Sequence, residues 1–351
     1  MAYSTISKPS LHFNTKLYTG NGGTNAITGV GFQPDWVWIK NRSNSSSHNV
    51  FDAVRGVTKA IFTNATDAEA TEASRLSAFG TDGFTINGDT SNQTNASGSN
   101  FASWNWKAGT GQGSSNTDGS INTTYTSVNT TAGFSISQYT GTGNAGTVGH
   151  GLGVAPKVII IKNISQDTDW VFGHQELDAS APWTKYLELN SNVTVLDNTV
   201  FNDTAPTNSV FSVGGDGKVS SGAGSHVAYC FAEKAGYSKF GKYSGNGNAD
   251  GSFVYTGFKP SVIIIKDKDN AENWFIFDNK RPGYNLNANH LNPNSNTTET
   301  NSSANTMDIL SNGFKMRATN NGINRSGGDG FLYMAFGQSI VGTNNVPCTA
   351  R

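Results

Sequence analysis

The sequence is short of charge and of long apolar runs. Charged residues occupy only 14% of the 351 positions and leave a net charge of −1. A chain so close to neutral offers no general attraction to nucleic acid. No apolar run is long enough to cross a bilayer, and residues 1–11 lack the basic and apolar segments of a secretory signal. We therefore expect no membrane insertion, no secretion by that route and no nucleic-acid partner.

Cysteine and familiar catalytic motifs are also scarce. The two cysteines, Cys230 in an apolar run and Cys348 in the polar tail, do not suggest a disulfide framework. The sequence contains no G-x-S-x-G nucleophile turn, no H-E-x-x-H zinc motif, no paired C-x-x-C and no phosphate-binding loop. Its six histidines lack the spacing of metal ligands. These absences favour a protein without a cofactor that binds rather than catalyses.

Glycine and small polar residues are what the sequence has in abundance. Its 41 glycines, together with asparagine, serine and threonine, fill the gaps between apolar runs. This composition suits β-structure with many tight turns and does not suit helical bundles. Aromatic residues make up 11% of the chain, which is enough to build cores that disordered chains lack. The composition therefore predicts an all-β fold.

Landmarks recur in the same order three times along the chain. Each copy opens with a tyrosine-led turn, continues into a strand preceded by proline, and closes on an aromatic strand. Fourteen residues past the three prolines lie the rings of His48, Trp170 and Trp274. Such a recurrence predicts three tandem β units. We place them at residues 16–109, 136–236 and 237–341.

The remaining segments flank or join these units. Residues 110–135 are rich in glycine, serine and threonine, and they are expected to form a flexible linker or a long surface loop. Residues 1–15 form a predicted N-terminal arm, and residues 342–351 form a C-terminal tail.

Several strands and one helix can be predicted within the units. The apolar, β-branched runs at 158–161 and 262–265 indicate strands that are covered on both faces. Lysines flank these runs, and we expect them to act as gatekeepers against edge pairing. They are Lys157, Lys162 and Lys266. Thr66 and Glu69 fit a helix capping box, which predicts about two helical turns ending near Ala73.

Acidic turns after two of the proline strands are candidates for a calcium site. Asp167 and Asp169 lie in the second unit, and Asp267 and Asp269 lie at the matching place in the third. Alternating carboxylates on a turn can bind Ca²⁺, but the glycine and the downstream glutamate of a calcium loop are missing. Solvated turn residues are therefore the favoured interpretation.

Aromatic side chains are candidates for sugar binding, because sugar faces stack on tryptophan and tyrosine. The candidates are Trp170, Trp183, Tyr186 and Trp274. The favoured alternative is packing in the core or between units, since Trp170 and Trp274 occupy equivalent positions in two repeats.

The first unit resembles a β-rich repeat of virion and tail-fibre-like proteins from marine tailed phages, such as cyanophages and pelagiphages. The stretches that carry the resemblance are YTG (18–20), GFQPDWVWIKNR (31–42), FDAVRG (51–56), DGF (82–84) and SWNWKAG (103–109). The third unit keeps FDNKRPG at 277–283, whereas the second unit has lost this segment. The resemblance implies a phage particle protein with a lectin-like or jelly-roll-like β-sandwich fold. It carries no catalytic residues.

Three functions are compatible with these observations. The first is a tail-fibre or appendage protein, made in the host cytoplasm and located in the virion. It would form a homo-oligomer, above all a homotrimer, and bind other virion proteins and a host-surface glycan or receptor. The second is a head decoration (cement) protein whose arm, residues 1–15, docks on the capsid. The third is a tailspike depolymerase, for which the sequence offers no recurring pair of carboxylates.

Overall fold

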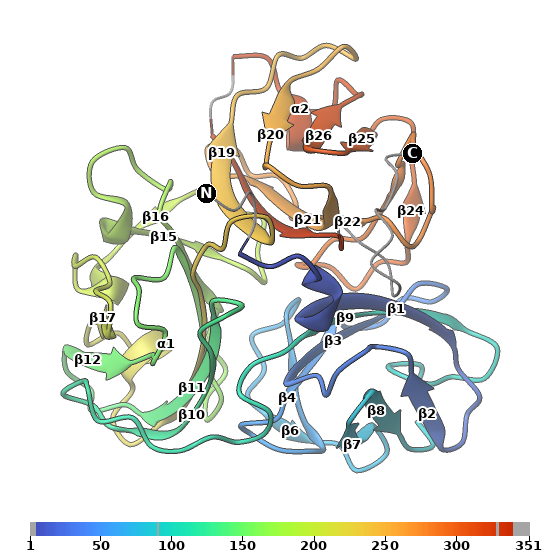
Figure 1. Cartoon of the computed structure of the whole chain (residues 1–351). Helices are drawn as coiled ribbons and strands as arrows, with labels where there is room; N and C mark the ends of the chain where they lie inside the picture. The colour runs from blue at the N-terminus through green and yellow to red at the C-terminus, as the bar shows by residue number, and fades with distance from the viewer. Residues whose placement is uncertain (1–4, 90, 328–329, 340–351) are drawn as a thin grey trace.

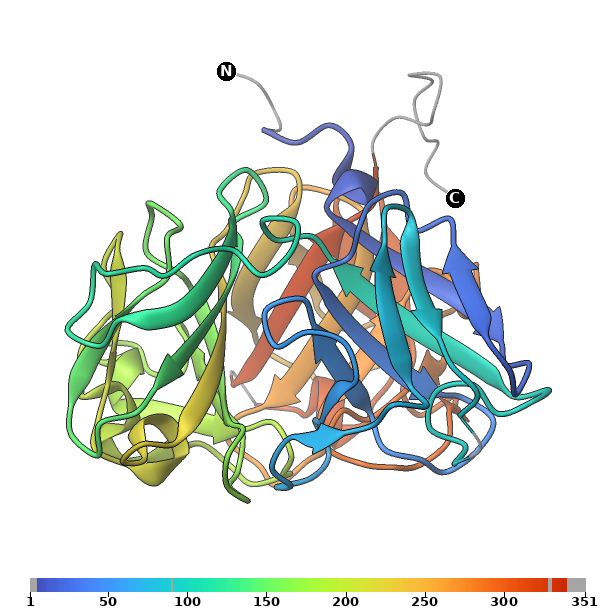
Figure 2. The same ribbon diagram turned by 90° about the horizontal axis from the view of Figure 1, so that it is seen from below.

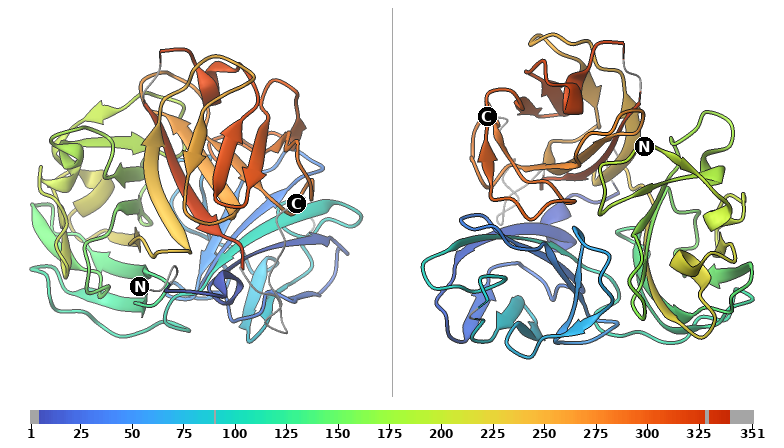
Figure 3. Two further views of the ribbon diagram at one scale, coloured as in Figure 1. Left: turned by 45° about the horizontal axis from the view of Figure 1, so that its top comes forward. Right: turned by 180° about the vertical axis from the view of Figure 1, so that it is seen from behind.

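A computed structural model describes residues 5–89, 91–327 and 330–339, and it confirms the all-β prediction. Three β-rich lobes surround one axis (Figure 1; Figure 3, right), and their sheets lie within residues 13–106, 123–231 and 238–337. Each lobe pairs a main antiparallel sheet with a smaller sheet, as in a β-sandwich. The lobes therefore have separate sheets.

The first lobe has a main sheet in the order β1-β9-β3-β4-β5-β6 and a small sheet in the order β2-β8-β7. The main strands are β1 (Phe13–Thr19), β9 (Asn100–Trp106), β3 (Trp36–Asn41), β4 (Asn49–Asp52), β5 (Lys59–Phe62) and β6 (Ala70–Thr71). The small sheet consists of β2 (Asn25–Thr28), β8 (Gly83–Ile86) and β7 (Leu76–Gly80). A short 3-10 helix, η1 (Pro9–Leu11), precedes β1.

The second lobe repeats this order and adds an edge strand, giving β10-β11-β18-β13-β14-β15-β16 with a small sheet of β12 and β17. The main strands are β10 (Thr123–Asn129), β11 (Phe134–Thr140), β18 (Ser225–Phe231), β13 (Val158–Asn163), β14 (Val171–His174), β15 (Lys185–Glu188) and β16 (Leu196–Asp197). The others are β12 (Gly146–Gly149), β17 (Val210–Val213), η2 (Pro182–Thr184), η3 (Thr199–Phe201) and α1 (Gly217–Ser220).

The third lobe has a main sheet in the order β19-β27-β21-β22 and a small sheet in the order β20-β26-β25. These strands are β19 (Ser238–Tyr243), β27 (Phe331–Gly337), β21 (Pro260–Asp267), β22 (Phe275–Asp278), β20 (Phe253–Tyr255), β26 (Gly313–Met316) and β25 (Met307–Leu310). The pair β23 (Asn289–His290) and β24 (Thr300–Asn301) and the helix α2 (Asn321–Asn324) complete the lobe.

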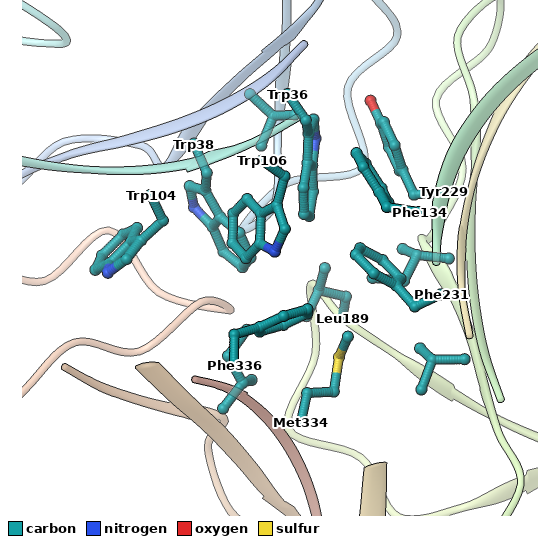
Figure 4. Close-up of a cluster of buried hydrophobic side chains, with 14 of the residues drawn as sticks. Trp36, Trp38, Trp104, Trp106, Phe134, Leu189, Tyr229, Phe231, Met334 and Phe336 are labelled. Atoms are coloured by element: carbon teal, nitrogen blue, oxygen red, sulfur yellow. The ribbon is translucent and has the colours of Figure 1, made fainter. Parts of the chain in front are cut away.

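The two faces of each main sheet contribute to different cores. In β13, Val158 and Ile160 enter a central core shared by all three lobes, whereas Ile159 and Ile161 enter the core of the second lobe. The prediction of strands covered on both faces is thus confirmed. The first lobe fills much of the centre with four fully buried indoles (Figure 4). They are Trp36, Trp38, Trp104 and Trp106.

Equivalent backbone hydrogen bonds close the lobes into a ring. Each donor N–H belongs to the residue just before a two-residue strand (β6, β16 or β24), and each acceptor carbonyl lies two residues past the buried lysine of the next lobe. The bonds run from Glu69 to Ile164 (3.0 Å), from Val195 to Lys268 (2.7 Å) and from Glu299 to Arg42 (3.1 Å). The first lobe thus binds the second, the second binds the third, and the third binds the first.

The predicted role of the lysines as edge gatekeepers is wrong. The strands β13 and β21 pair with neighbours on both sides, so Lys162, Lys266 and the preceding Lys157 do not lie on a sheet edge. Lys162, Lys266 and the equivalent Lys40 are fully buried, and each ammonium donates to the carbonyl of the next residue at 2.6 to 2.8 Å. Burial lowers the pKa of all three ammonium groups to about 8.

The helix predicted at 66–73 does not form. The segment is extended, and β6 within it pairs with β5. Its backbone N–H groups form hydrogen bonds with the second lobe. Ala68 N donates to Asp167 Oδ1 at 2.8 Å, and Glu69 N donates to Ile164 O. A two-turn helix is only marginally stable by itself, so these tertiary bonds decide the conformation.

The predicted linker at 110–135 is structured and contains β10, which extends the main sheet of the second lobe. Its beginning is fixed by the buried carboxylate of Asp35. This carboxylate accepts hydrogen bonds from the backbone N–H groups of Ala108 (2.7 Å), Thr110 (3.0 Å) and Gly111 (2.7 Å). The connection between the first two lobes is therefore tied down at its start.

The predicted N-terminal arm at 1–15 is folded against the ring where it is described. Ile6 is buried in the central core, and β1 begins within the segment. Ser10 N donates to Ser339 Oγ at 3.1 Å, so the described beginning and end of the chain lie together at one end of the axis (Figure 2). The predicted tail at 342–351 lies outside the described residues.

Candidate functional site

The four aromatic candidates for sugar stacking are buried, as the favoured interpretation of packing in the core or between units predicts. Trp170 and Trp274 are at most 1% exposed, and Trp183 and Tyr186 lie in the core of the second lobe. Because protein atoms cover their faces, none of the four rings is available to a sugar.

Two of these rings bind neighbouring lobes instead. Trp170 Nε1 donates to the Phe62 carbonyl of the first lobe at 2.8 Å, and Trp274 Nε1 donates to the Glu188 carbonyl of the second lobe at 3.0 Å. His48 holds the same position in the first lobe. Its Nδ1 accepts a hydrogen bond from Trp38 Nε1 at 2.9 Å, and burial lowers the pKa of the ring well below its usual value. Trp170 and Trp274 therefore pack between lobes, which is the interpretation that the sequence favoured.

The acidic turn residues do not form a calcium site. Their carboxylates are separately occupied by donors, and no cluster of three or more potential metal ligands occurs in the described part of the chain. The pairs are Asp167 with Ala68 N (2.8 Å), Asp169 with Lys218 (3.1 Å), Asp267 with Arg325 (3.2 Å) and Asp269 with Lys268 (2.6 Å). Cys230 is a buried free thiol, and Cys348 lies outside the described residues.

A cleft of about 600 Å³ lies where the third lobe meets the second. The strands β19 and β20 and the Tyr333 ring of β27 form its third-lobe side. Gln175, Glu176 and Glu233 form its second-lobe side. The cleft is open, and its lining combines aromatic rings with polar and charged groups.

Two exposed aromatic residues of β20 line this cleft. Phe253 is 47% exposed and Tyr255 is 58% exposed, while Val254 between them is buried in the core of the third lobe. Alternation along a strand therefore places both rings on the outward face.

The fold does not require these rings. In the small sheets, Val254 pairs with Phe314, as Ile27 pairs with Phe84 in the first lobe and Val148 with Phe211 in the second. This register identifies the residues equivalent to Phe253 and Tyr255. They are Ala26 and Thr28 in the first lobe, and Thr147 and Gly149 in the second. The two exposed rings are therefore specific to the third lobe.

The charged groups in the cleft are matched within the protein. Glu176 lies 3.7 Å from Lys242, and Glu233 accepts the Phe240 N–H at 2.7 Å. Lys239 Nζ donates to the Tyr255 carbonyl at 3.1 Å and lies 5.4 Å from the centre of its ring.

The Tyr333 ring of the cleft is neutral. Burial, and then the nearby Glu233 and Glu176, raise the pKa of Tyr333 above its usual value. Each of the two carboxylates of the cleft has a partner within the protein, Lys242 for Glu176 and the Phe240 N–H for Glu233.

Sequence reasoning missed Phe253 and Tyr255. The signal was a three-residue alternation, Phe-Val-Tyr, in a strand too short to stand out. Aligning the small strands of the three units would have exposed it, because the other two units carry small residues at both places.

Comparison with known proteins gives the family of the chain. No curated protein and no solved structure matches it. Among the helices in the described residues, none is long and apolar enough to span a membrane. The family match covers residues 8–339 and therefore includes all three lobes and the junctions between them. The chain belongs to the family described as "Domain of unknown function (DUF7483)".

Proposed function

We propose that the protein is a tailed-phage virion component of the tail-fibre or appendage type. In this proposal it attaches the particle to its host by binding a surface glycan, without catalysis. The observation that carries the proposal is the exposed Phe253–Tyr255 pair in the cleft, where both equivalent strands have small residues. The resemblance of the first unit to virion proteins supports the setting.

The cleft fits glycan binding better than protein docking. Its aromatic faces lie beside amide, hydroxyl and charged groups, so a ligand with both apolar faces and many hydroxyls would meet partners for each. Surface loops with abundant Gly, Asn, Ser and Thr surround the rigid sheets, as in many recognition proteins.

Decoration of the phage head is the alternative role. In the version that uses residues 1–15 as a free docking arm, residues 5–15 would have to leave the ring. Ile6 is buried in the central core, and Thr5 N donates to the Ala235 carbonyl at 3.2 Å. Strand β1 also takes all seven of its residues into the main sheet. These contacts argue against that version.

A tailspike depolymerase would need a pair of carboxyl groups that flank the scissile bond. Glu176 and Glu233 are the acidic residues of the cleft, and Lys242 and a backbone N–H occupy them. Incubating the pure protein with bacterial polysaccharides tests this alternative, and we expect no release of shorter chains.

Glycan-array binding tests the attachment role. We expect the labelled protein to bind at least one bacterial surface polysaccharide. We also expect the double variant Phe253→Ala/Tyr255→Thr, which writes the residues of the first lobe into β20, to lose that binding. The control is Tyr284→Ala, which removes a 76% exposed ring outside the cleft residues. Binding that survives the double variant would refute the proposed site.

Location and assembly are separate parts of the proposal. Immunogold electron microscopy of particles that carry this chain should label the tail, whereas labelling across the head would favour decoration. Native mass spectrometry counts the copies that associate with one another. A strict monomer, with no virion partner in cross-linked particles, would contradict the proposed homo-oligomer and its other virion partners.

A further inference from the structure

We infer that the ligand of the cleft is a neutral, linear polysaccharide that lies along β20, with neighbouring sugar rings on Phe253 and Tyr255. This inference rests on the proposed glycan-binding function and deepens it. It specifies the charge, the shape and the number of ligands per chain.

The spacing of the two rings favours an extended chain. Residues two apart in a strand are separated by about 6.6 Å, which is on the scale of one sugar residue. Phe253 and Tyr255 point to the same side, because the buried Val254 between them points into the lobe. A linear ligand that runs parallel to the strand can therefore cover both rings.

The pairing of charges favours a neutral ligand. The cleft contains two lysines and two glutamates, Lys239, Lys242, Glu176 and Glu233. Lys242 faces Glu176, Lys239 is held over the Tyr255 ring, and Glu233 accepts a backbone N–H. The two lysines and two glutamates leave the lining without net charge, so neither an anionic nor a cationic sugar would gain a net attraction.

Neutral hydrogen-bonding groups complete the lining. The amide of Gln175 and the hydroxyls of Ser244 and Ser252 lie in the same cleft. Gln175 is fixed in place, because its Nε2 donates to the Phe240 carbonyl at 2.7 Å. Amide and hydroxyl groups match the hydroxyls of an uncharged sugar.

The lobes differ in a way that predicts one site per chain. The strands β2 and β12 place Ala26, Thr28, Thr147 and Gly149 where β20 has its two rings. Neither strand has an aromatic platform at these positions, so we expect a stoichiometry of one.

Calorimetry with three hexasaccharides tests the inference. The probes are cellohexaose and maltohexaose, which are neutral, and hexagalacturonate, which is acidic. We expect a neutral probe to bind with one site per chain and with little change between low and high salt. Phe253→Ala and Tyr255→Thr should each weaken binding by roughly tenfold, the loss typical of one stacked ring. Tyr284→Ala should leave it unchanged.

The possible results distinguish a failure of this inference from a failure of the proposed glycan-binding function. Preference for hexagalacturonate, or affinity that falls steeply with salt, would overturn the neutral class while leaving glycan binding in place. So would binding of only acidic glycans on the array. If the protein binds no glycan at all, both this inference and the proposed glycan-binding function are overturned. Because the altered side chains are exposed and the first lobe carries the replacements, thermal melting should confirm that the variants are folded.

Discussion

Tyr229 of the second lobe donates its phenolic hydroxyl to Asp52 Oδ2 of the first lobe across 2.7 Å. Asp52 also forms a buried ion pair with Arg55 at 2.5 Å, so the bond joins a charged network. In the third lobe the equivalent carboxylate is Asp278, which accepts from Trp104 of the first lobe at 3.1 Å. At two junctions, therefore, a carboxylate accepts a hydrogen bond from a side chain of the neighbouring lobe.

The junction between the second and third lobes differs. The position of the carboxylate is taken by His174, and the residue in register with Tyr229 and Trp104 is Met334, which has no donor. His174 Nε2 instead lies 3.4 Å from the carbonyl of Tyr333. Each junction thus carries a pairing suited to its own neighbour. We conclude that the lobes are not interchangeable, although four strands of each main sheet follow the same order.

Removing the hydroxyl of Tyr229 should destabilise the ring. Tyr229→Phe deletes a buried hydrogen bond to a charged group, which typically contributes about 1.5–3 kcal/mol. Urea unfolding measures the loss. The control is Tyr237→Phe, a buried tyrosine whose hydroxyl has no partner among the described residues, and it should change stability little. Equal losses in the two variants would contradict the role of the Asp52 bond.

Replacing Trp274 should cost more than replacing Trp106. Both indoles are buried, but only Trp274 Nε1 has a partner, the Glu188 carbonyl. Substitution by phenylalanine removes similar volume in each case, and Trp274→Phe also removes one inter-lobe hydrogen bond, at an expected extra cost of about 1 kcal/mol. Guanidinium unfolding of the two variants gives the difference. A larger loss at Trp106 would show that packing at the axis outweighs the bond.

Asp35→Ala should release the start of the connection between the first two lobes. The carboxylate of Asp35 holds three backbone N–H groups, and without it these groups lose their partner. We expect faster hydrogen exchange and new protease cleavage at residues 108–115. Asp118→Ala, which alters an exposed side chain of the same connection, is the control. Unchanged exchange in Asp35→Ala would mean that β10 alone orders the segment.

The sequence carried the local information on this fold and little of the long-range information. Proline followed by β-branched residues is enough to predict β13 and β21, because strand preference and two-sided burial are encoded in consecutive residues. The ring is different. Its closure depends on single backbone hydrogen bonds, such as the one from Glu69 N to Ile164 O, and no pattern of residues in the sequence predicts them. The helix predicted around Glu69 failed for that reason.

The candidate site was hidden by a similar limit. A sequence does not distinguish a buried tryptophan from an exposed one. Trp170 and Trp274 were therefore considered for sugar stacking, although both are buried. The rings that are exposed, Phe253 and Tyr255, stand in a three-residue strand. What sets them apart is their difference from the equivalent positions in the other lobes, and the sheet register reveals that equivalence.

Acid should destabilise the protein through its buried histidines. Burial lowers the pKa of His174, His226 and His290 to about 4, whereas histidine in an unfolded chain titrates near about 6.5. Below that value the unfolded chain takes up protons that the folded chain refuses. The stability is therefore fully present above about pH 6.5 and is lost progressively as the pH falls towards 4, by about 2 kcal/mol per histidine at pH 5.

Urea unfolding from pH 8 to pH 4.5 measures this dependence. His290→Asn removes one of these groups, so below about pH 6.5 the slope of unfolding free energy against pH should fall by about 1.4 kcal/mol per pH unit. The slope is the informative quantity, because the substitution also alters packing against Phe275 and Phe277 at every pH. A slope identical to that of the unaltered protein would show that His290 is protonated in the folded state, and its burial in the third lobe would then need a compensating anion.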